Sequence, residues 1–231
     1  MAINGIDVSH HQSISVYAKA IKDAAFCICK ATEGKSWVDE KFTLYMQDAI
    51  GKGKLIGAYH FARPDNNNPE EEAQHFLAIV KPYLGTCILA LDWEGAALQY
   101  DLSWAKTWLD YVYKKTGVRP LFYASASVLS KAKEIANADY GLWVAHYGVS
   151  SPSIYPWMQQ AIWQYEGGTD QSKPWDKDIF YGGADQWQKY CTPEFIELPD
   201  EVDNVGECLH WKERAIAAEA KLEEIKQLVQ Y

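Results

Sequence analysis

The sequence predicts an α/β fold: an irregular (β/α) barrel similar to a TIM barrel, with eight strands and about five helices, followed by a linker and a C-terminal helix. Short apolar segments with the composition of strands recur along the first 181 residues. Helical periodicity separates the earlier segments, and strands that alternate with helices favour a parallel sheet. The chain has 231 residues, 48% of them hydrophobic, which is enough to fill the core of one such barrel.

The strand segments are short, as strands of a barrel are. One of them starts with the apolar run Cys87–Leu91, which indicates a strand buried on both faces. The eight expected strands are Asn4–Ser9, Ala25–Thr32, Leu55–Ala62, Cys87–Glu94, Pro120–Ala124, Gly141–Tyr147, Ala161–Glu166 and Asp178–Tyr181.

Helix signals lie between the earlier strands. Asn68 and Pro69 have the types preferred at a helix start, and Gly117 has the type preferred just after a helix end. After Tyr140 the helical periodicity fades, so we expect a weak helical wall on the later side of the barrel. The expected helices are Ser15–Asp23, Asp39–Gly51, Asn68–Val80, Ser103–Thr116 and Ala126–Ile135.

Three parts follow from this pattern: a catalytic barrel over residues 1–191, a linker rich in proline and acids over 192–206, and an amphipathic helix over 207–231. The helix has apolar residues spaced by alternating threes and fours, as in a coiled coil. The sequence leaves open whether it docks on the barrel, binds another surface or joins copies into a homo-oligomer. Its seam consists of Cys208, Trp211, Ala215, Ala218, Leu222, Ile225 and Val229.

Composition excludes several classes of function. The net charge of −9 and the lack of a Lys/Arg run argue against nucleic acid, and no apolar run is long enough for a membrane span. No signal peptide is evident in residues 1–15, and the five cysteines form no CxxC pair, so we expect reduced thiols in a protein made in the cytoplasm. We expect no cofactor and no metal, because zinc, nucleotide and esterase motifs are missing.

Acidic residues mark the strand ends where barrel enzymes do their chemistry. Asp92 and Glu94 end the fourth strand and point to the same side, because side chains alternate along a strand. Asp7 lies late in the first strand, and Asp178 flanks the last. Two adjacent carboxyls cannot both ionise freely, and a protonated acid beside an ionised one is what hydrolysis of a glycosidic bond requires.

Polar and aromatic side chains accompany these acids on the expected strands. An acidic pit with an aromatic rim suits a sugar, because aromatic faces stack on sugar rings while carboxylates act on the bond that breaks. The expected substrate-binding residues are Tyr59, Tyr123, Trp143, Tyr147, Gln164 and His10.

Five short motifs, in this order, give the chain its resemblance to glycoside hydrolase family 25, the Chalaropsis-type lysozymes. The resemblance covers about residues 4–185, and Asp178 matches a late aspartate of the family although its neighbours differ. The motifs are Gly5–Gln12, Lys30–Gly34, Gly57–Phe61, Leu91–Glu94 and Ile162–Tyr165.

The resemblance implies an N-acetylmuramidase that hydrolyses the β-1,4 bond between N-acetylmuramic acid and N-acetylglucosamine in bacterial peptidoglycan, with retention of configuration. It implies that Glu94 is the general acid and that Asp92 is the nucleophile or orients the substrate's acetamido group, with Asp7 and Asp178 as the other carboxylates. The layout also resembles bacteriophage endolysins, which reside in the host cytoplasm before release to the wall.

Two other functions compete with this one. A non-catalytic sugar-binding barrel keeps the aromatic rim but usually loses an acid, whereas all four acids are present here. A metal-dependent hydrolase of the same polymer is the third alternative, and its activity would be sensitive to a chelator.

Overall fold

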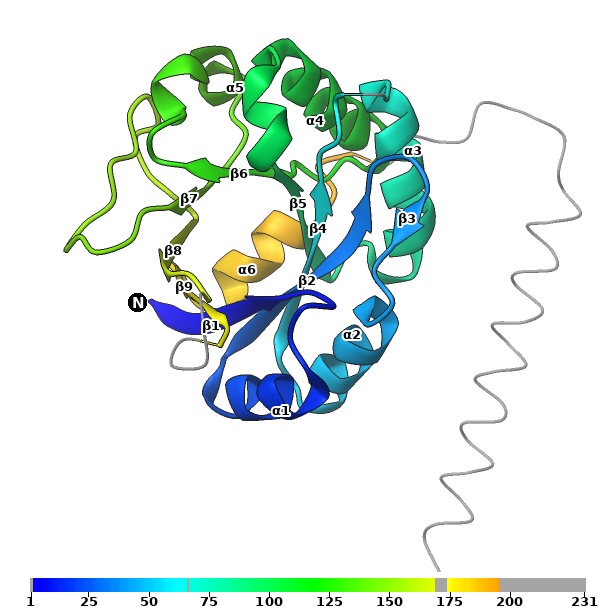
Figure 1. The fold of residues 1–231 in the computed structure, drawn as a ribbon, viewed down its shortest axis with the longest axis vertical. Coiled ribbons are helices and arrows are strands. Elements are labelled where there is room, and N and C mark those ends of the chain that lie inside the picture. The colour runs from blue at the N-terminus through cyan, green and yellow to red at the C-terminus, as the bar shows by residue number, and fades with distance from the viewer. Residues whose placement is uncertain (1, 66, 169–173, 196–231) are drawn as a thin grey trace, which may run out of the picture. The chain divides into compact units, whose positions relative to one another are not determined.

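The strands of the computed structural model, which describes residues 2–65, 67–168 and 174–195, form one sheet that closes into a barrel (Figure 1). The order is β1-β9-β8-β7-β6-β5-β4-β2-β3, and a further pairing of β1 with β2 closes the ring of eight strands, with β3 outside it. The strands are β1 (Ile3–Val8), β2 (Phe26–Glu33), β3 (Trp37–Val38), β4 (Leu55–Phe61), β5 (Cys87–Asp92), β6 (Leu121–Ser125), β7 (Leu142–Ala145), β8 (Ile162–Glu166) and β9 (Asp176–Phe180).

Six α-helices are present in the described residues. Asn68 accepts a hydrogen bond from the Glu70 backbone at the start of α3, and Gly117 ends α4 with a φ of 69°, so both sequence signals act as expected. The helices are α1 (Ile14–Asp23), α2 (Phe42–Gly51), α3 (Pro69–Val80), α4 (Leu102–Thr116), α5 (Lys133–Asn137) and α6 (Ala184–Cys191).

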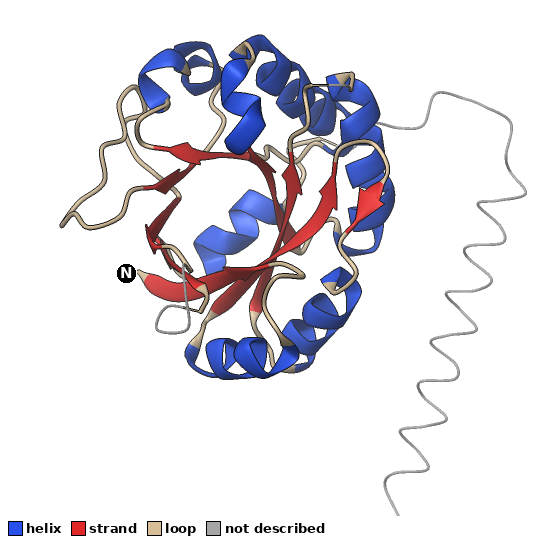
Figure 2. Ribbon diagram, viewed as in Figure 1, coloured by secondary structure: helices blue, strands red, loops and turns tan. Residues whose placement is uncertain are grey.

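The sequence predicted that helices fade after Tyr140, and the structure confirms this between β7 and β8. The expected helix over 126–135 is replaced by a short 3-10 turn, Leu129–Lys131, and by the five residues of α5. The connection from β7 to β8 contains no helix, and Figure 2 shows only loop on that side of the ring. The eight-stranded α/β barrel is therefore correct in class and irregular in the expected place.

One strand runs opposite to the expected direction. β9 pairs antiparallel with both β1 and β8, whereas the other neighbours in the ring are parallel. The expectation of a fully parallel sheet was therefore wrong at this strand. The carboxyl ends of the parallel strands form the mouth of the barrel. Because β9 is antiparallel to them, its first residue lies at the mouth and its last residue lies at the opposite end.

Two hydrophobic clusters lie on the two sides of the barrel wall. The outer cluster packs the strands against the helices and contains Ile6, Val8, Leu89, Leu91 and Trp93, which confirms that the acidic faces of β1 and β5 point inward. The inner cluster fills the interior of the barrel.

Helix α6, which the sequence did not predict, contributes to the inner cluster. Its Trp187 is buried against Phe26 and Phe180, with ring centroids 4.8 and 5.0 Å away, and donates a hydrogen bond to the Ile56 carbonyl. Figure 1 shows α6 lying across the ring of strands. The helix therefore closes the end of the barrel opposite the carboxyl ends of the parallel strands.

The described residues all belong to one compact unit, 1–197. Residues 192–195, the first of the predicted linker, contact the barrel: the Glu194 backbone donates to the Gly117 carbonyl, and its carboxylate pairs with Arg119 at 2.8 Å. The rest of the linker and the predicted helix over 207–231 lie outside the described residues. In the described ranges four cysteines are free and buried, and no helix is long and apolar enough to cross a membrane.

Candidate active site

A cavity of about 380 Å³ opens where β1, β4, β5, β6 and β7 end. Four carboxylates reach it from three parts of the barrel: Asp7 from β1, Asp92 and Glu94 from the end of β5, and Asp176 from the start of β9. The remaining lining residues are Ser9, His11, Gln12, Tyr59, Tyr123, Trp143, Tyr147, Gln164, Gly167 and Gly168.

The end of β5 places Asp92 and Glu94 on the same side. Glu94 continues the extended backbone, with φ −147° and ψ −174°, so the side-chain alternation of the strand persists through it. Trp93 points the other way, is buried, and packs on Trp104 with ring centroids 5.8 Å apart. Asp92 is buried, while Glu94 is exposed at the open edge of the cavity.

Both carboxyls of this pair are harder to ionise than usual. Burial raises the pKa of Asp92, and the neighbouring Glu94 raises it further. Glu94 is exposed as a whole residue, but the walls of the cavity partly desolvate its carboxyl and raise its pKa, and the negative charge of Asp176 adds to the effect. The positive charge of Lys30 lowers the pKa of both carboxyls and so partly offsets these effects. Among protein atoms of the described residues, the buried Asp92 Oδ1 has no hydrogen-bond partner, so it is an unsatisfied acceptor on a residue that lines the cavity.

Asp178 does not line the cavity but lies directly beneath it. It is fully buried, faces Gly5 in the register with β1, and accepts a hydrogen bond from the Trp143 indole at 2.8 Å. Asp7 accepts a hydrogen bond of 2.6 Å from the Gln164 amide, and the neighbouring Asp178 carboxyl favours the protonated form of Asp7. Burial raises the pKa of Asp7, as do the charges of Asp176 and Asp178. The pKa of Asp178 is raised by burial to about 8. The pair therefore holds a proton at neutral pH.

Asp176 completes the acidic cavity, although the sequence analysis missed it. It faces Asp7 in the antiparallel register, accepts a 2.6 Å hydrogen bond from the Gly168 backbone, and has its pKa raised by burial. The available signal was its spacing of two from Asp178, which puts both on the same face of a strand. The direction of β9 then makes Asp176 the residue at the mouth and Asp178 the deeper one.

Aromatic side chains form one wall of the cavity. Trp143 meets Tyr123 and Tyr59 edge to face, with ring centroids 4.7 and 6.2 Å apart. The hydroxyls of Tyr123 and Tyr147 both donate to Gln164 Oε1. Five of the six expected substrate-binding residues thus lie together, and hydrogen bonds to Gln164 and Asp178 hold Tyr123, Tyr147 and Trp143 in place before any ligand arrives.

His10 is the expected substrate-binding residue that the structure places elsewhere. Its Nδ1 lies 3.0 Å from the buried Asp39 carboxylate, and its ring faces a neighbouring pocket. The adjacent His11 lines the acidic cavity instead. The two rings stand 3.9 Å apart, so sequence position alone did not distinguish them.

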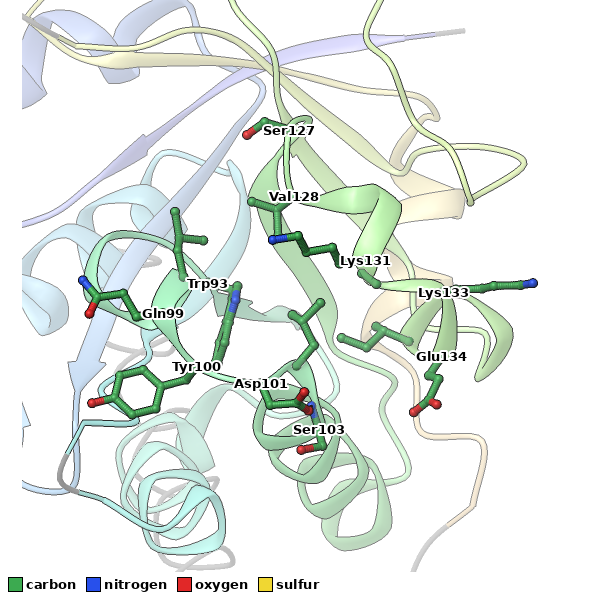
Figure 3. A pocket seen from close by; sticks show the side chains of 14 residues that line it. Trp93, Gln99, Tyr100, Asp101, Ser103, Ser127, Val128, Lys131, Lys133 and Glu134 are labelled. Carbon is green, nitrogen blue, oxygen red and sulfur yellow. The ribbon is translucent and has the colours of Figure 1, made fainter.

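A larger hollow, of about 850 Å³, lies on the other side of Trp93. Figure 3 shows it between the segment that carries Gln99 and Tyr100 and the segment that carries Lys131 and Glu134. Its Asp101 is engaged as the cap of α4, accepting from the Ser103 backbone at 2.8 Å. This hollow lacks the adjacent pair Asp92 and Glu94, so the smaller cavity is the candidate active site.

Comparison with known proteins agrees with this geometry. The family model described as "Glycosyl hydrolases family 25" matches residues 6–172. Lysozyme M1 of Streptomyces globisporus is 32% identical over an alignment of 208 positions, which covers 79% of this chain and 69% of that protein. The N,O-diacetylmuramidase of Chalaropsis sp is 30% identical over an alignment of 183 positions, which covers 70% of this chain and 87% of that protein.

A solved structure supports the same relationship. The family GH25 lysozyme from Aspergillus fumigatus superimposes with a TM-score of 0.70 at 27% identity, covering 83% of this chain and all of that one. The resemblance of the five sequence motifs is therefore confirmed. The chain belongs to the glycosyl hydrolases of family 25.

Proposed function

We propose that this glycoside hydrolase is an N-acetylmuramidase, which cleaves the β-1,4 bond between N-acetylmuramic acid and N-acetylglucosamine in bacterial peptidoglycan with retention. The observation that carries the proposal is the pair of Asp92 and Glu94 on one side of the end of β5, inside a cavity with further carboxyls. The names of the relatives, a lysozyme and a diacetylmuramidase, support the substrate.

Glu94 acts as the general acid in this proposal. It stands at the open edge of the cavity, where a glycosidic oxygen can approach, and burial together with Asp176 raises its pKa, so that it keeps a proton to donate. Loss of the leaving sugar then builds positive charge on the anomeric carbon. The deeper Asp92 faces that charge with an oxygen that no described protein group binds.

Asp92 has two routes to a retained product. It attacks the anomeric carbon itself, or it holds the substrate's 2-acetamido group so that the acetamido oxygen attacks. The routes differ in what they require of the substrate. A glycan whose muramoyl residues lack the N-acetyl group is still cleaved by the first route and is not cleaved by the second, whereas Asp92→Asn abolishes both.

Substitution of Glu94 tests the assignment of the acid. Glu94→Gln keeps the size of the side chain but cannot protonate a leaving oxygen, so we expect turnover of cell walls to fall by roughly 10² to 10⁴-fold. Circular dichroism and the thermal midpoint should stay as in the wild type. Glu134→Gln, in the larger hollow, is the matched control. Wild-type clearing of walls by Glu94→Gln would remove this residue from the role.

The products separate this function from its rivals. A muramidase leaves muramic acid at the new reducing ends, which borohydride reduction and sugar analysis identify, whereas a glucosaminidase leaves glucosamine. A sugar-binding barrel creates no new ends. In the described ranges no group of three or more His, Cys, Asp or Glu side chains is arranged to hold a metal ion. Full activity after extensive treatment with a chelator would exclude the metal-dependent alternative.

We further propose that the enzyme serves a bacteriophage as an endolysin and is held in the host cytoplasm until a pore opens the membrane. The support is the layout, a family 25 barrel followed by a predicted linker and a predicted helix. Cells of a susceptible host that express the chain should lyse only after the membrane is permeabilised. Lysis without permeabilisation would contradict this proposal but not the muramidase activity.

A further inference from the structure

A second pocket, of about 500 Å³, adjoins the acidic cavity, and His11 lines both. The loops that follow β1, β2 and β4 form it, at the same end of the barrel as the cavity. We call it the cationic pocket. Its lining residues are His10, His11, Glu33, Gly34, Lys35, Ser36, Trp37, Arg63 and Asn67.

The charge of this pocket differs from that of the acidic cavity. Glu33 accepts from both Lys30 Nζ, at 2.6 Å, and Arg63 Nε, at 2.7 Å, so two cations share one carboxylate. Lys35 lies 3.7 Å from Glu71, and both side chains are more than half exposed, so water weakens that pair. Among the side chains that line the pocket, Lys35 and Arg63 are cationic and Glu33 is anionic, so the lining carries one net positive charge on a chain whose net charge is −9.

An aromatic surface accompanies these cations. Trp37 is 38% exposed, its ring meets His10 edge to face at 5.0 Å, and Lys30 Nζ lies 5.1 Å from its centroid. Trp37 belongs to the short strand β3, which pairs with the end of β2. An exposed indole held in place by a strand is a suitable platform for a sugar ring.

The position of Arg63 is fixed from behind by buried groups. Glu72, fully buried on α3, accepts hydrogen bonds from the Arg63 backbone at 3.1 Å and from the Asn67 amide at 2.8 Å. The same carboxylate bonds His60 Nε2 at 2.7 Å. The loop after β4 is therefore anchored, so its guanidinium is presented without a large loss of chain entropy on binding.

From these features we infer that the cationic pocket is a further glycan subsite, which takes a muramoyl residue by stacking on Trp37 and by pairing its carboxylate with Arg63 and Lys35. The inference rests on the proposed function, because it names the substrate of that same site. The carboxylate has two sources in peptidoglycan: the lactyl ether, when no peptide is attached, and the stem peptide, when one is.

The direct test uses three soluble glycans with the full chain. The first bears stem peptides, the second has them removed by an amidase so that the lactyl carboxylate is free, and the third is the second with that carboxylate amidated. We expect wild-type kcat/KM on a carboxylate-bearing glycan to exceed that on the amidated glycan by about five- to tenfold, through KM, as for a half-exposed charge-assisted contact. Preference for the first or the second glycan identifies the source of the carboxylate.

Variants then locate the preference. Arg63→Gln and Lys35→Gln should each reduce the ratio of kcat/KM between charged and amidated glycans, and the double variant should bring it close to one. Lys106→Gln, which removes one positive charge from α4, is the control and should leave the ratio unchanged. Lys35 is exposed, so its variant tests the pocket even if Arg63→Gln is poorly folded.

The outcomes distinguish this inference from the proposed function. A wild-type enzyme that cleaves all three glycans equally well overturns the subsite and leaves the muramidase intact. Equal loss on charged and amidated glycans in the variants also overturns it, because that result indicates a structural role. An enzyme that produces no muramic acid ends from any glycan overturns the proposed function itself.

Discussion

Two aspartates at the floor of the cavity share a proton. Asp7 and Asp178 lie carboxyl to carboxyl, with the Gln164 amide donating to one and the Trp143 indole to the other. Because the pKa of Asp178 is raised to about 8, the folded protein binds a proton here that the unfolded chain releases above about pH 4. The stabilising effect is complete below pH 4 and is lost as the pH rises towards 8.

Asp178→Asn should therefore flatten the dependence of stability on pH. The asparagine amide mimics the protonated carboxyl, so we expect the variant to match the wild type near pH 5 and to be more stable at pH 8 by about 1–3 kcal/mol. Thermal midpoints measured between pH 5 and pH 8 provide the comparison. Parallel curves for the two proteins would show that Asp178 does not carry the proton.

Asp176 should set the alkaline side of the activity profile. Its negative charge is the largest influence on Glu94 after burial and raises the pKa of that carboxyl. Asp176→Asn removes the charge, the pKa of Glu94 falls, and the protonated form is lost at a lower pH. We therefore expect the alkaline limb of the kcat/KM profile to move to lower pH. A limb that stays in place or moves to higher pH would contradict this assignment.

Individual residues show what the sequence could reveal about the site. Alternation along β1 and β5 correctly predicted the inward direction of Asp7, Asp92 and Glu94. The face on which a side chain lies depends only on whether its position in the strand is odd or even. How far a residue lies below the mouth of the barrel depends on the direction of its strand, and the alternation of side chains does not give that direction. For that reason Asp178 was predicted as a site residue, whereas Asp176 on the same face was not.

At the level of helices and strands, local signals succeeded where they were strong. Capping by Asn68 and termination at Gly117 predicted α3 and α4 to within a residue or so. Helix α6 was missed because it has eight residues and directly follows a Gly-Gly pair, which indicates a turn. Its formation depends on tertiary burial of Trp187, which local sequence does not reveal.

Removal of that tryptophan should measure how much the closing helix contributes. Trp187→Ala leaves a cavity among Phe26, Phe180 and Ile56, so we expect a loss of about 3–5 kcal/mol of unfolding free energy. Urea denaturation gives the value. Lys189→Ala, at an exposed position of the same helix, should change stability by less than about 0.5 kcal/mol. Similar midpoints for the two variants would show that α6 is not needed to close the barrel.

At the scale of the whole molecule, the alternation of strands and helices determined the fold class, and the loss of periodicity after Tyr140 located its irregular side. The reversal of β9 was not predicted, because the alternation of side chains along Asp176–Phe180 is the same in either chain direction. The short connection between β8 and β9 fits an antiparallel pair, since a parallel crossover commonly needs a dozen or more residues.

The predicted seam in residues 207–231 makes self-association testable. If the seam joins copies of the chain, light scattering of the full-length protein gives a multiple of its 26.2 kDa mass. Leu222→Lys places a charge in the seam and should reduce that mass to a monomer. Lys221→Leu is a control next to the seam and should leave it unchanged. A full-length chain that is monomeric at micromolar concentration would rule out this role.

The reversed strand has a consequence for engineering. In a barrel of uniform direction, new specificity is introduced by varying the segments that follow each strand. Here the segment that precedes β9 borders the cavity, through Gly167, Gly168 and Asp176, whereas the turn after β9 leads into α6 at the closed end. A combinatorial library should therefore diversify positions ahead of Asp176, and it should leave 181–183 unchanged, because Gly182 is buried against Phe180 and Gly183 caps α6.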